Sequence, residues 1–223
     1  DRPDTLIKFQ VIDDSSSDEN LKKLKDLINT HGIGCEIINH DKNEHKEKIA
    51  AENNQETFGN LSSLLKCFEV AKKDQSDLIY FVEDDYLHYE HSLVDMLNTY
   101  ERVSSQHKDE IIVCPSDYPF NYMNNEKTNI LIGSQQHWRT ITKMLCTFMI
   151  SKKMFQKHID NFEKTCEKRH EPFEKYLNKI LESEIGISPI KSLAIHMTNV
   201  NSSYGLSPFI DIKKLWEENK IGQ

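Results

Sequence analysis

The sequence contains little glycine or proline and no long apolar run. Seven glycines and six prolines among 223 residues are too few for a chain dominated by linkers or low-complexity segments. No apolar stretch approaches the ~20 residues that a membrane-spanning helix needs, and no signal peptide is visible. We therefore expect a folded chain without a transmembrane segment.

Paired cysteines and the common catalytic signatures are missing as well. The five cysteines stand at positions 35, 67, 114, 146 and 166, and no two of them form a CxxC pair. We expect reduced thiols and a cytoplasmic location, at the membrane surface only through other domains. The sequence has no Walker loop, no GxSxG motif and no catalytic Cys–His arrangement.

Positive charge is scarce relative to negative charge. The chain has 28 Lys and Arg against 36 Asp and Glu, which gives a net charge of -8. Non-specific binding to nucleic acid needs a cationic face that displaces counterions, so we expect no nucleic-acid partner. A phosphate ligand remains compatible with this charge, because a bound metal ion can supply positive charge locally.

The sequence alternates short apolar runs with helical periodicity, a pattern typical of an α/β fold with a parallel-type sheet. Strands are predicted at residues 7–12, 35–38, 78–82, 111–114, 146–150 and 193–195. Helices are predicted at 18–28, 61–71 with Asn60 as the cap, 93–100, 152–161 and 173–181. Residues 120–140 are expected to form a long surface loop or hairpin.

An acidic cluster at the end of a predicted buried strand is the strongest local signal. The run Leu78–Val82 is continuously apolar, and Glu83, Asp84 and Asp85 follow it directly. In open α/β sheets ligands bind outside the carboxyl ends of the strands. Three adjacent carboxylates repel one another, and hard divalent cations such as Mg²⁺ or Mn²⁺ bind such oxygens. The alternative interpretation is a solvated acidic loop.

A second predicted strand also ends in carboxylates and hydroxyls. Asp13, Asp14 and Ser15 follow Val11 and Ile12. Asp and Ser are also ordinary turn and helix-capping residues, which is the alternative explanation. Two such strand ends in one sheet favour two sides of a single pocket, one for a base or ribose and one for a metal and diphosphate.

The segments VIDDSSSDE (11–19) and LIYFVEDDYLH (78–88) together resemble the GT-A glycosyltransferases, especially the inverting family-2-like group. The resemblance implies a GT-A-type, Rossmann-like, mostly parallel sheet flanked by helices. It implies one domain over 1–223, with a nucleotide-sugar-binding half (1–115) and an acceptor-binding half (116–223), within a longer chain if an upstream strand is missing. The sequence has Glu-Asp-Asp in place of the family's Asp-x-Asp motif.

The resemblance assigns donor-side roles to both acidic strand ends. Asp85 would bind the metal, and Glu83 or Asp84 would contact the ribose or a metal-bound water. Asp13 and Asp14, with Ser15, would face the base and ribose. We place Asn60 among the same nucleotide-sugar contacts. A C-terminal histidine often completes the metal site in this fold, which suggests His196, although a lone histidine at a strand end can be purely structural.

The resemblance also suggests acceptor-side residues. Asp117 and Tyr118 follow the strand predicted at 111–114 and would point toward the acceptor. Trp138 would stack on a sugar face, and Arg139 would pair with a phosphate or carboxylate. The alternatives are that Trp138 packs in a loop and that Arg139 pairs with an acidic side chain of the protein.

Inverting transfer needs a carboxylate base that accepts the proton of the acceptor hydroxyl. In the resembling enzymes this base often begins a helix after the acceptor loop, which points to Glu171, with Pro172 in the first turn. An acid there can also simply stabilise the helix. Asp117 is the second candidate for the base.

These expectations combine into a metal-dependent hexosyltransferase-type enzyme that uses Mn²⁺ or Mg²⁺. The donor would be a nucleotide-sugar, with a UDP-sugar favoured, and the acceptor a hydroxyl of a glycan or glycoconjugate. Two alternatives remain. A sugar-phosphate nucleotidyltransferase would need a glycine-rich basic loop, which is not seen, and a non-catalytic nucleotide- or carbohydrate-binding module would bind without turnover.

Overall fold

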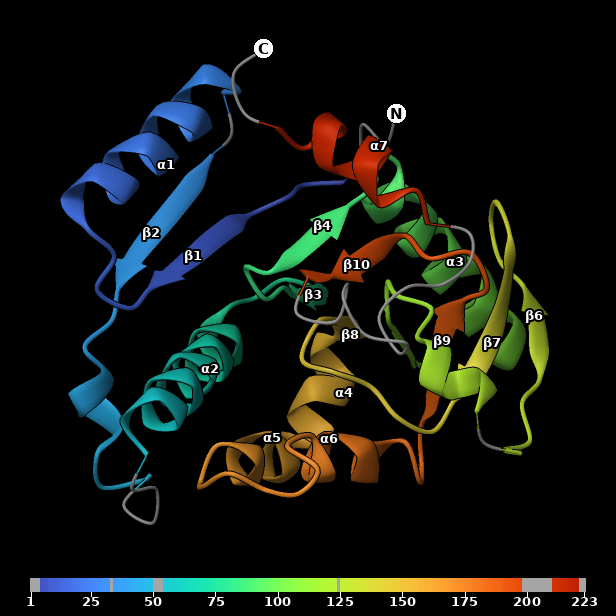
Figure 1. Cartoon of the computed structure of the whole chain (residues 1–223). Helices are drawn as coiled ribbons and strands as arrows, with labels where there is room; N and C mark the ends of the chain where they lie inside the picture. The colour runs from blue at the N-terminus through green and yellow to red at the C-terminus, as the bar shows by residue number, and fades with distance from the viewer. Residues whose placement is uncertain (1–4, 33, 50–53, 124, 198–209, 221–223) are drawn as a thin grey trace. The chain divides into compact units, whose positions relative to one another are not determined.

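The computed structural model describes residues 5–32, 34–49, 54–123, 125–197 and 210–220. The chain forms two compact units, each of which is described by itself. Unit 1 comprises Asp1–Asp74 and Phe162–Phe173, and unit 2 comprises Gln75–Asn161 and Glu174–Gln223. Figure 1 labels their helices and strands.

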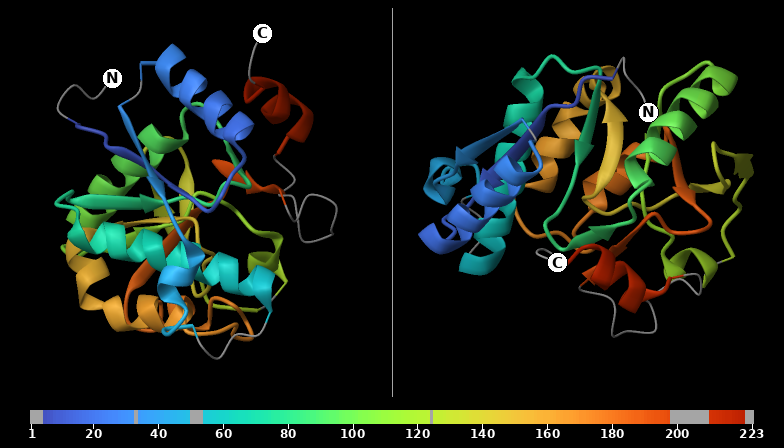
Figure 2. Two further views of the ribbon diagram at one scale, coloured as in Figure 1. Left: turned by 90° about the vertical axis from the view of Figure 1, so that its left-hand side faces the viewer. Right: turned by 90° about the horizontal axis from the view of Figure 1, so that it is seen from above.

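Unit 1 is built on two parallel strands. Its elements are β1 (Phe9–Asp13), α1 (Asp18–Thr30), β2 (Cys35–Asn39), the 3-10 helix η1 (Lys42–His45) and α2 (Gln55–Lys73). Parallel strands need a crossover connection, which α1 supplies between β1 and β2. α1 lies beside β2 (Figure 1), and α2 packs on β1 (Figure 2).

The helix starts of unit 1 follow from their capping residues. The Ser17 side chain accepts a hydrogen bond from the Asn20 amide, so α1 begins where it was predicted. Asn54 accepts hydrogen bonds from the amides of Glu56 and Thr57 and caps α2. The prediction that Asn60 caps this helix is therefore wrong, because Asn54 captures the amides of the first turn and Asn60 lies inside the helix.

The second unit holds a mixed six-stranded sheet in the order β3-β8-β5-β9-β7-β6. Its strands are β3 (Leu78–Phe81), β5 (Ile111–Val113), β6 (Ile130–Ile132), β7 (His137–Ile141), β8 (Phe148–Ser151) and β9 (Ile185–Pro189). A separate antiparallel pair is formed by β4 (Tyr86–His88) and β10 (Ala194–His196). The other elements of the chain are α3 (Ser92–His107), η2 (Pro119–Tyr122), α4 (Lys152–Lys157), α5 (Ile159–Thr165), α6 (Lys175–Ile180) and α7 (Ile212–Glu218).

The α/β class is as predicted, but the sheet is mixed rather than mostly parallel. β5 and β9 are parallel, whereas β3–β8, β5–β8, β7–β9 and β6–β7 are antiparallel. β8 runs against both neighbours, so β3, β5 and β9 share one direction. Their carboxyl ends consequently lie at the same edge of the sheet, which is where ligands bind in open α/β sheets.

The main core of unit 2 packs α3 against this sheet. Met96, Tyr100 and Val103 of α3 join Ile111, Val113, Met149 and Ile187 of the strands. Trp138 of β7 belongs to this core and has no exposed surface. Residues 120–140 are therefore not only a surface loop, because their β6–β7 hairpin contributes a core residue.

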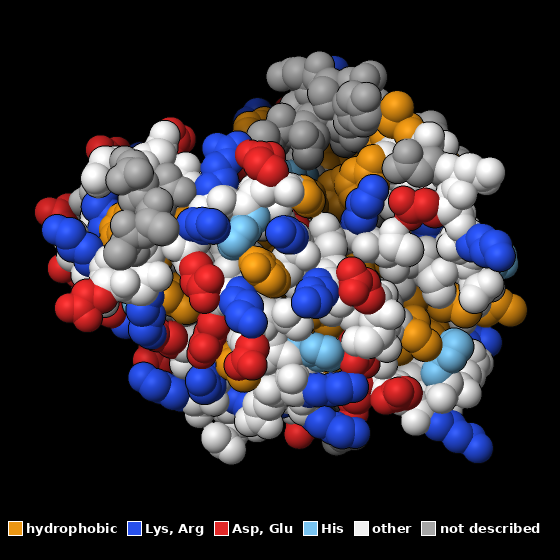
Figure 3. All heavy atoms as spheres, turned by 90° about the horizontal axis from the view of Figure 1, so that it is seen from below, with side chains coloured by type: hydrophobic (Ala, Val, Ile, Leu, Met, Phe, Trp, Pro, Cys, Tyr) orange, Lys and Arg blue, Asp and Glu red, His pale blue; other side chains and the backbone are white. Residues whose placement is uncertain are grey.

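Within the described residues, no helix is both long and apolar enough to cross a membrane. On the face drawn in Figure 3, Lys and Arg side chains are interspersed with Asp and Glu.

Candidate functional site

The acidic cluster forms the tight turn between β3 and β4 in unit 2. The Tyr86 amide donates a hydrogen bond to the Glu83 carbonyl over 3.3 Å, which closes the turn. The Glu83 amide donates to Thr147 Oγ1 over 3.0 Å, and this threonine immediately precedes β8. The turn thus lies at the edge of the sheet where β3 ends and β8 begins.

The two predicted metal ligands, Asp85 and His196, lie in contact. Pairing of β4 with β10 places His196 opposite Tyr86. His196 Nε2 lies 2.8 Å from Asp85 Oδ2, and the Met197 amide donates to the Asp85 carbonyl over 2.8 Å. The ring of Tyr86 stacks on that of His196, with centroids 4.8 Å apart and planes 11° apart. This stacking holds the imidazole beside the carboxylate.

Glu83 lies in a concentrated negative field. Burial raises its pKa to about 7, and the charges of Asp85, Glu174 and Asp84 add to the effect. A hydrogen bond from Thr147 opposes it in part. Protonation of Glu83 or binding of a cation would each relieve this repulsion.

Glu174 joins this group and was not predicted. It is the N-cap residue of α6, and its side chain makes no hydrogen bond to the first turn of that helix. The expected cap, Glu171, instead precedes a cis peptide bond to Pro172, and its side chain is 84% exposed beside Arg169. The prediction that Glu171 caps the helix is wrong, because the chain turns through residues 171–174 before α6 begins. Glu171 belongs to unit 1 and Glu174 to unit 2.

Tyr118 lies behind the acidic turn. Its hydroxyl forms a short hydrogen bond with that of Tyr86, and its ring stacks on Phe120 with centroids 5.1 Å apart. Tyr118 is only 7% exposed. Burial raises the pKa of both tyrosines, so both hydroxyls stay neutral. Tyr118 therefore binds the Tyr86 hydroxyl, and its burial leaves little of its side chain accessible to an acceptor.

Asp117 and Arg139 form a buried ion pair. The Asp117 amide donates to Ser192 Oγ over 2.7 Å, and its carboxylate lies 3.7 Å from the Arg139 guanidinium. The Tyr122 hydroxyl donates to Asp117 over 2.5 Å and accepts a short hydrogen bond from Arg139. Arg139 thus pairs with an internal carboxylate. Because positive charge and a donated hydrogen bond stabilise its ionised form, Asp117 is poorly suited to act as a base.

The prediction that Trp138 stacks on an acceptor sugar is wrong. Its side chain is fully buried in the core of unit 2. A Cβ at Gly133 would lie 2.2 Å from the indole ring, so this glycine makes room for the tryptophan. The side chain faces inward because alternate residues of β7 point to opposite faces of the sheet.

The remaining predicted nucleotide contacts lie in unit 1. Asp13 ends β1 and is 8% exposed, and its carbonyl accepts a hydrogen bond from the His40 amide over 2.8 Å. Asp14 and Ser15 are exposed, and Ser15 adopts a left-handed φ of 66°. Asn60 is exposed in the middle of α2. Asp14 and Ser15 are thus accessible at the carboxyl end of β1.

Two further observations concern ligands. Among the side chains that the structure describes, no group of three or more His, Cys, Asp or Glu is arranged to hold a metal ion. A hollow of about 400 Å³ in unit 1 is lined by Lys25, Ile28, Asn29, Cys35 and Ile37. The hollow includes none of the predicted site residues, so we base the site on the acidic turn and its hydrogen bonds.

Sequence reasoning missed several residues that build the site. Tyr86 directly follows the acidic cluster, and Thr147 directly precedes the apolar residues of β8, so their neighbours in the sequence could have indicated both. Ser192 and Glu174 carry no comparable local signal. No protein family model matches this chain. A search of curated proteins likewise gives no significant match.

Proposed function

We propose that this protein is a metal-dependent glycosyltransferase that transfers a sugar from a nucleotide-sugar to a hydroxyl group. The observation that carries the proposal is the contact between Asp85 and His196 at the acidic turn after β3. A carboxylate and an imidazole converge there beside two more carboxylates, at the edge where β3, β5 and β9 end. This is the expected position of a ligand site in an α/β sheet.

The residue types at the turn suit a divalent cation, although the described side chains do not form a three-ligand arrangement. Asp85 would supply an oxygen ligand, and His196 would supply a nitrogen ligand after Nε2 loses the proton that it donates to Asp85. Mn²⁺ accepts both kinds of ligand, and Mg²⁺ would be bound chiefly through oxygen. The pKa of Glu83 is raised chiefly by burial, and the charges of Asp85, Glu174 and Asp84 raise it further, which a bound cation would offset. A bound metal would supply positive charge for the diphosphate leaving group.

In unit 2, the exposed Asp84 of the acidic turn would contact the donor. In unit 1, Asp14 and Ser15 are exposed at the end of β1, and a role for them in binding a nucleoside rests on the family resemblance. Glu83 is positioned by Thr147 and would contact the ribose or a metal-bound water. A UDP-sugar is the favoured donor, and transfer with inversion is favoured, on the family resemblance alone.

We assign the role of base to Glu174 in place of Glu171. The resemblance calls for a carboxylate at the start of the helix after the acceptor loop, and Glu174 is the N-cap of that helix. The charge of Glu174 raises the pKa of Glu83, so its carboxylate lies near the acidic turn. Glu174 would accept the proton of the acceptor hydroxyl as the new glycosidic bond forms.

The test is release of nucleotide from UDP-, GDP-, CDP- and dTDP-sugars, with and without Mn²⁺, in the presence of a panel of glycan acceptors. We expect metal-dependent release of one nucleotide with matching incorporation of sugar. Release of pyrophosphate from a nucleoside triphosphate and a sugar phosphate would instead indicate a nucleotidyltransferase. Nucleotide-sugar binding without turnover would indicate a non-catalytic module.

A further inference from the structure

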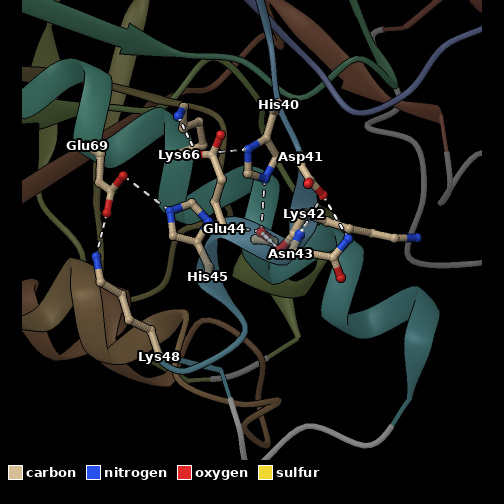
Figure 4. Close-up of polar contacts among 10 residues, drawn as sticks. His40, Asp41, Lys42, Asn43, Glu44, His45, Lys48, Lys66 and Glu69 are labelled. Atoms are coloured by element: carbon tan, nitrogen blue, oxygen red, sulfur yellow. Dashed lines mark hydrogen bonds and ion pairs between the residues drawn. The ribbon is translucent and has the colours of Figure 1, made fainter.

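Unit 1 contains two buried histidines that the proposed function does not use. His40 follows β2, and His45 ends η1. Their side chains are 0% and 3% exposed, and the ring centroids are 5.2 Å apart. Figure 4 shows both rings between η1 and α2. We call His40, His45, Ser62 and Glu69 the Ser62 cluster.

The hydroxyl of Ser62 fixes the protons on both rings. Ser62 Oγ donates to the Lys42 carbonyl over 2.8 Å, and a carbonyl can only accept. This uses the one hydroxyl proton of Ser62. His40 Nε2 and His45 Nδ1, both 2.9 Å from Ser62 Oγ, must therefore be the donors.

His40 is accordingly neutral, with its proton on Nε2. Its Nδ1 is buried without a hydrogen-bond partner, and the nearest carboxylate oxygen, of Glu44, is 3.9 Å away. Burial lowers the pKa of His40, and the neighbouring His45 and Lys66 lower it further. The carboxylates of Glu44 and Asp14 act in the opposite direction but do not prevail.

His45 lies between Ser62 and Glu69. Its Nδ1 donates to Ser62, and its Nε2 lies 3.2 Å from Glu69 Oε2. An ionised carboxylate only accepts, so this contact is a hydrogen bond when Nε2 also carries a proton. Burial raises the pKa of Glu69, but hydrogen bonds from Lys48 and His45 outweigh burial and lower it overall, so the carboxylate stays ionised.

We propose that His40 is a pH-sensitive switch, called here the His40 lock. While His40 is neutral, β2, η1 and α2 stay packed around it, and protonation of His40 favours local opening of this packing. A proton on His40 Nδ1 would create a buried cation beside the His45 ring, whose centroid is 5.2 Å away. It would also leave a buried N–H group without an acceptor, which is costly. Opening relieves both penalties because water then solvates the ring.

Release of the lock would free specific backbone hydrogen bonds. The His40 amide donates to the Asp13 carbonyl over 2.8 Å, and the Ile49 amide donates to the His45 carbonyl over 3.0 Å. The first of these bonds ties the end of β2 to the end of β1. The lock therefore also bears on the position of Asp13 and Asp14, a consequence that rests on the proposed function.

The sign of the pH dependence follows from the lowered pKa of His40. The open form takes up a proton near the ordinary histidine pKa of 6.5, whereas the closed form takes it up only at lower pH. The lock is fully effective above pH 6.5 and weakens as the pH falls toward the pKa of the closed form. The equilibrium constant for opening rises by up to about fivefold between pH 6.5 and 5.5, and its slope approaches tenfold per pH unit only at lower pH.

Two measurements on the full chain test the lock. Nitrogen-15 NMR of the histidine rings at pH 7.5 should show His40 neutral with its proton on Nε2, and a proton on Nδ1 of His45. Amide hydrogen exchange, corrected for intrinsic rates, should show protection of His40 and Ile49 falling by up to about fivefold between pH 6.5 and 5.5.

Variants separate His40 from the other titrating groups. His40→Gln keeps an N–H group for Ser62 but does not titrate, so its protection should change little over the same window. His31→Gln, at an exposed position of unit 1, should behave like the wild type. A charged His40 at pH 7.5, or equal pH dependence in the wild type and His40→Gln, would overturn the proposal. Neither readout needs a nucleotide, so failure here is distinct from failure of the proposed function.

Discussion

His196 donates a hydrogen bond to the carboxylate of Asp85 over 2.8 Å, although the two residues are 111 positions apart in the chain. The contact depends on the small β4–β10 sheet, whose register sets His196 opposite Tyr86. The sheet therefore joins a C-terminal histidine to the acidic turn that follows β3. This relationship underlies the functional proposal.

The choice of base is tested by a pair of glutamine variants. Glu174→Gln should lower the rate of sugar transfer by about 10²- to 10⁴-fold, because the amide cannot accept the acceptor proton. Donor binding should persist. Glu171→Gln should keep near-normal transfer, since that side chain is 84% exposed and pairs with Arg169. The opposite pattern in steady-state kinetics would return the role to Glu171.

Trp138 should matter for stability and not for acceptor recognition. Trp138→Ala removes a fully buried side chain and should lower the free energy of unfolding by about 3–5 kcal/mol. Trp216 is 49% exposed, so Trp216→Ala provides the matched control and should cost much less. Chemical denaturation of both variants makes the comparison. Equal small losses would mean that the core packing of Trp138 is misassigned.

The buried ion pair should show strong coupling. Arg139→Met leaves the Asp117 carboxylate buried without its cation and should cost about 3–5 kcal/mol. Asp117→Asn combined with Arg139→Met should recover part of that loss, because the uncompensated charge is then gone. A double-mutant cycle from urea denaturation measures the coupling. Strictly additive losses would show that the two side chains do not interact.

Glu184 should make stability depend on pH in the acid range. Burial raises its pKa, but hydrogen bonds from Lys157 and His158, each 2.7 Å long, outweigh burial and lower it below 4.5. Its contribution is therefore present above pH 4.5 and is lost as the pH falls through the lowered pKa. The stability difference between wild type and Glu184→Gln should shrink below pH 4.5. The difference for Glu182→Gln, at an exposed neighbouring position, should be small throughout, and a constant difference for Glu184→Gln would contradict the assignment.

Local sequence signals predicted most of the strands but not the order of the sheet. Leu78–Phe81 and Ile111–Val113 are apolar runs, and both form strands as predicted. β9 was missed because Gly186, Ser188 and Pro189 interrupt its apolar pattern, although its residues are mostly buried. Strand direction depends on pairing between distant segments, such as β8 with β3, which periodicity does not encode.

In the candidate site too, features set by neighbouring residues were predicted, and features set by contacts between distant segments were not. The position of Glu83–Asp85 at a strand end follows from adjacent residues, so the sequence was sufficient to predict it. The partners of Arg139 are Asp117 and Tyr122, and they come from another part of the chain. The helix expected to begin near Glu171 begins at Lys175, and that shift of a few residues replaced one candidate base with another.

The most direct test of the account is calorimetric binding of UDP, GDP, CDP and dTDP, each with and without Mn²⁺, to the wild type and to Asp85→Ala. Asp109→Ala, which removes an exposed acid of unit 2 outside the acidic turn, is the control. The account predicts that one nucleotide binds only with the metal, that Asp85→Ala abolishes this binding and that Asp109→Ala retains it. Absence of metal-linked binding to all four nucleotides, or unchanged binding by Asp85→Ala, would contradict the central claim.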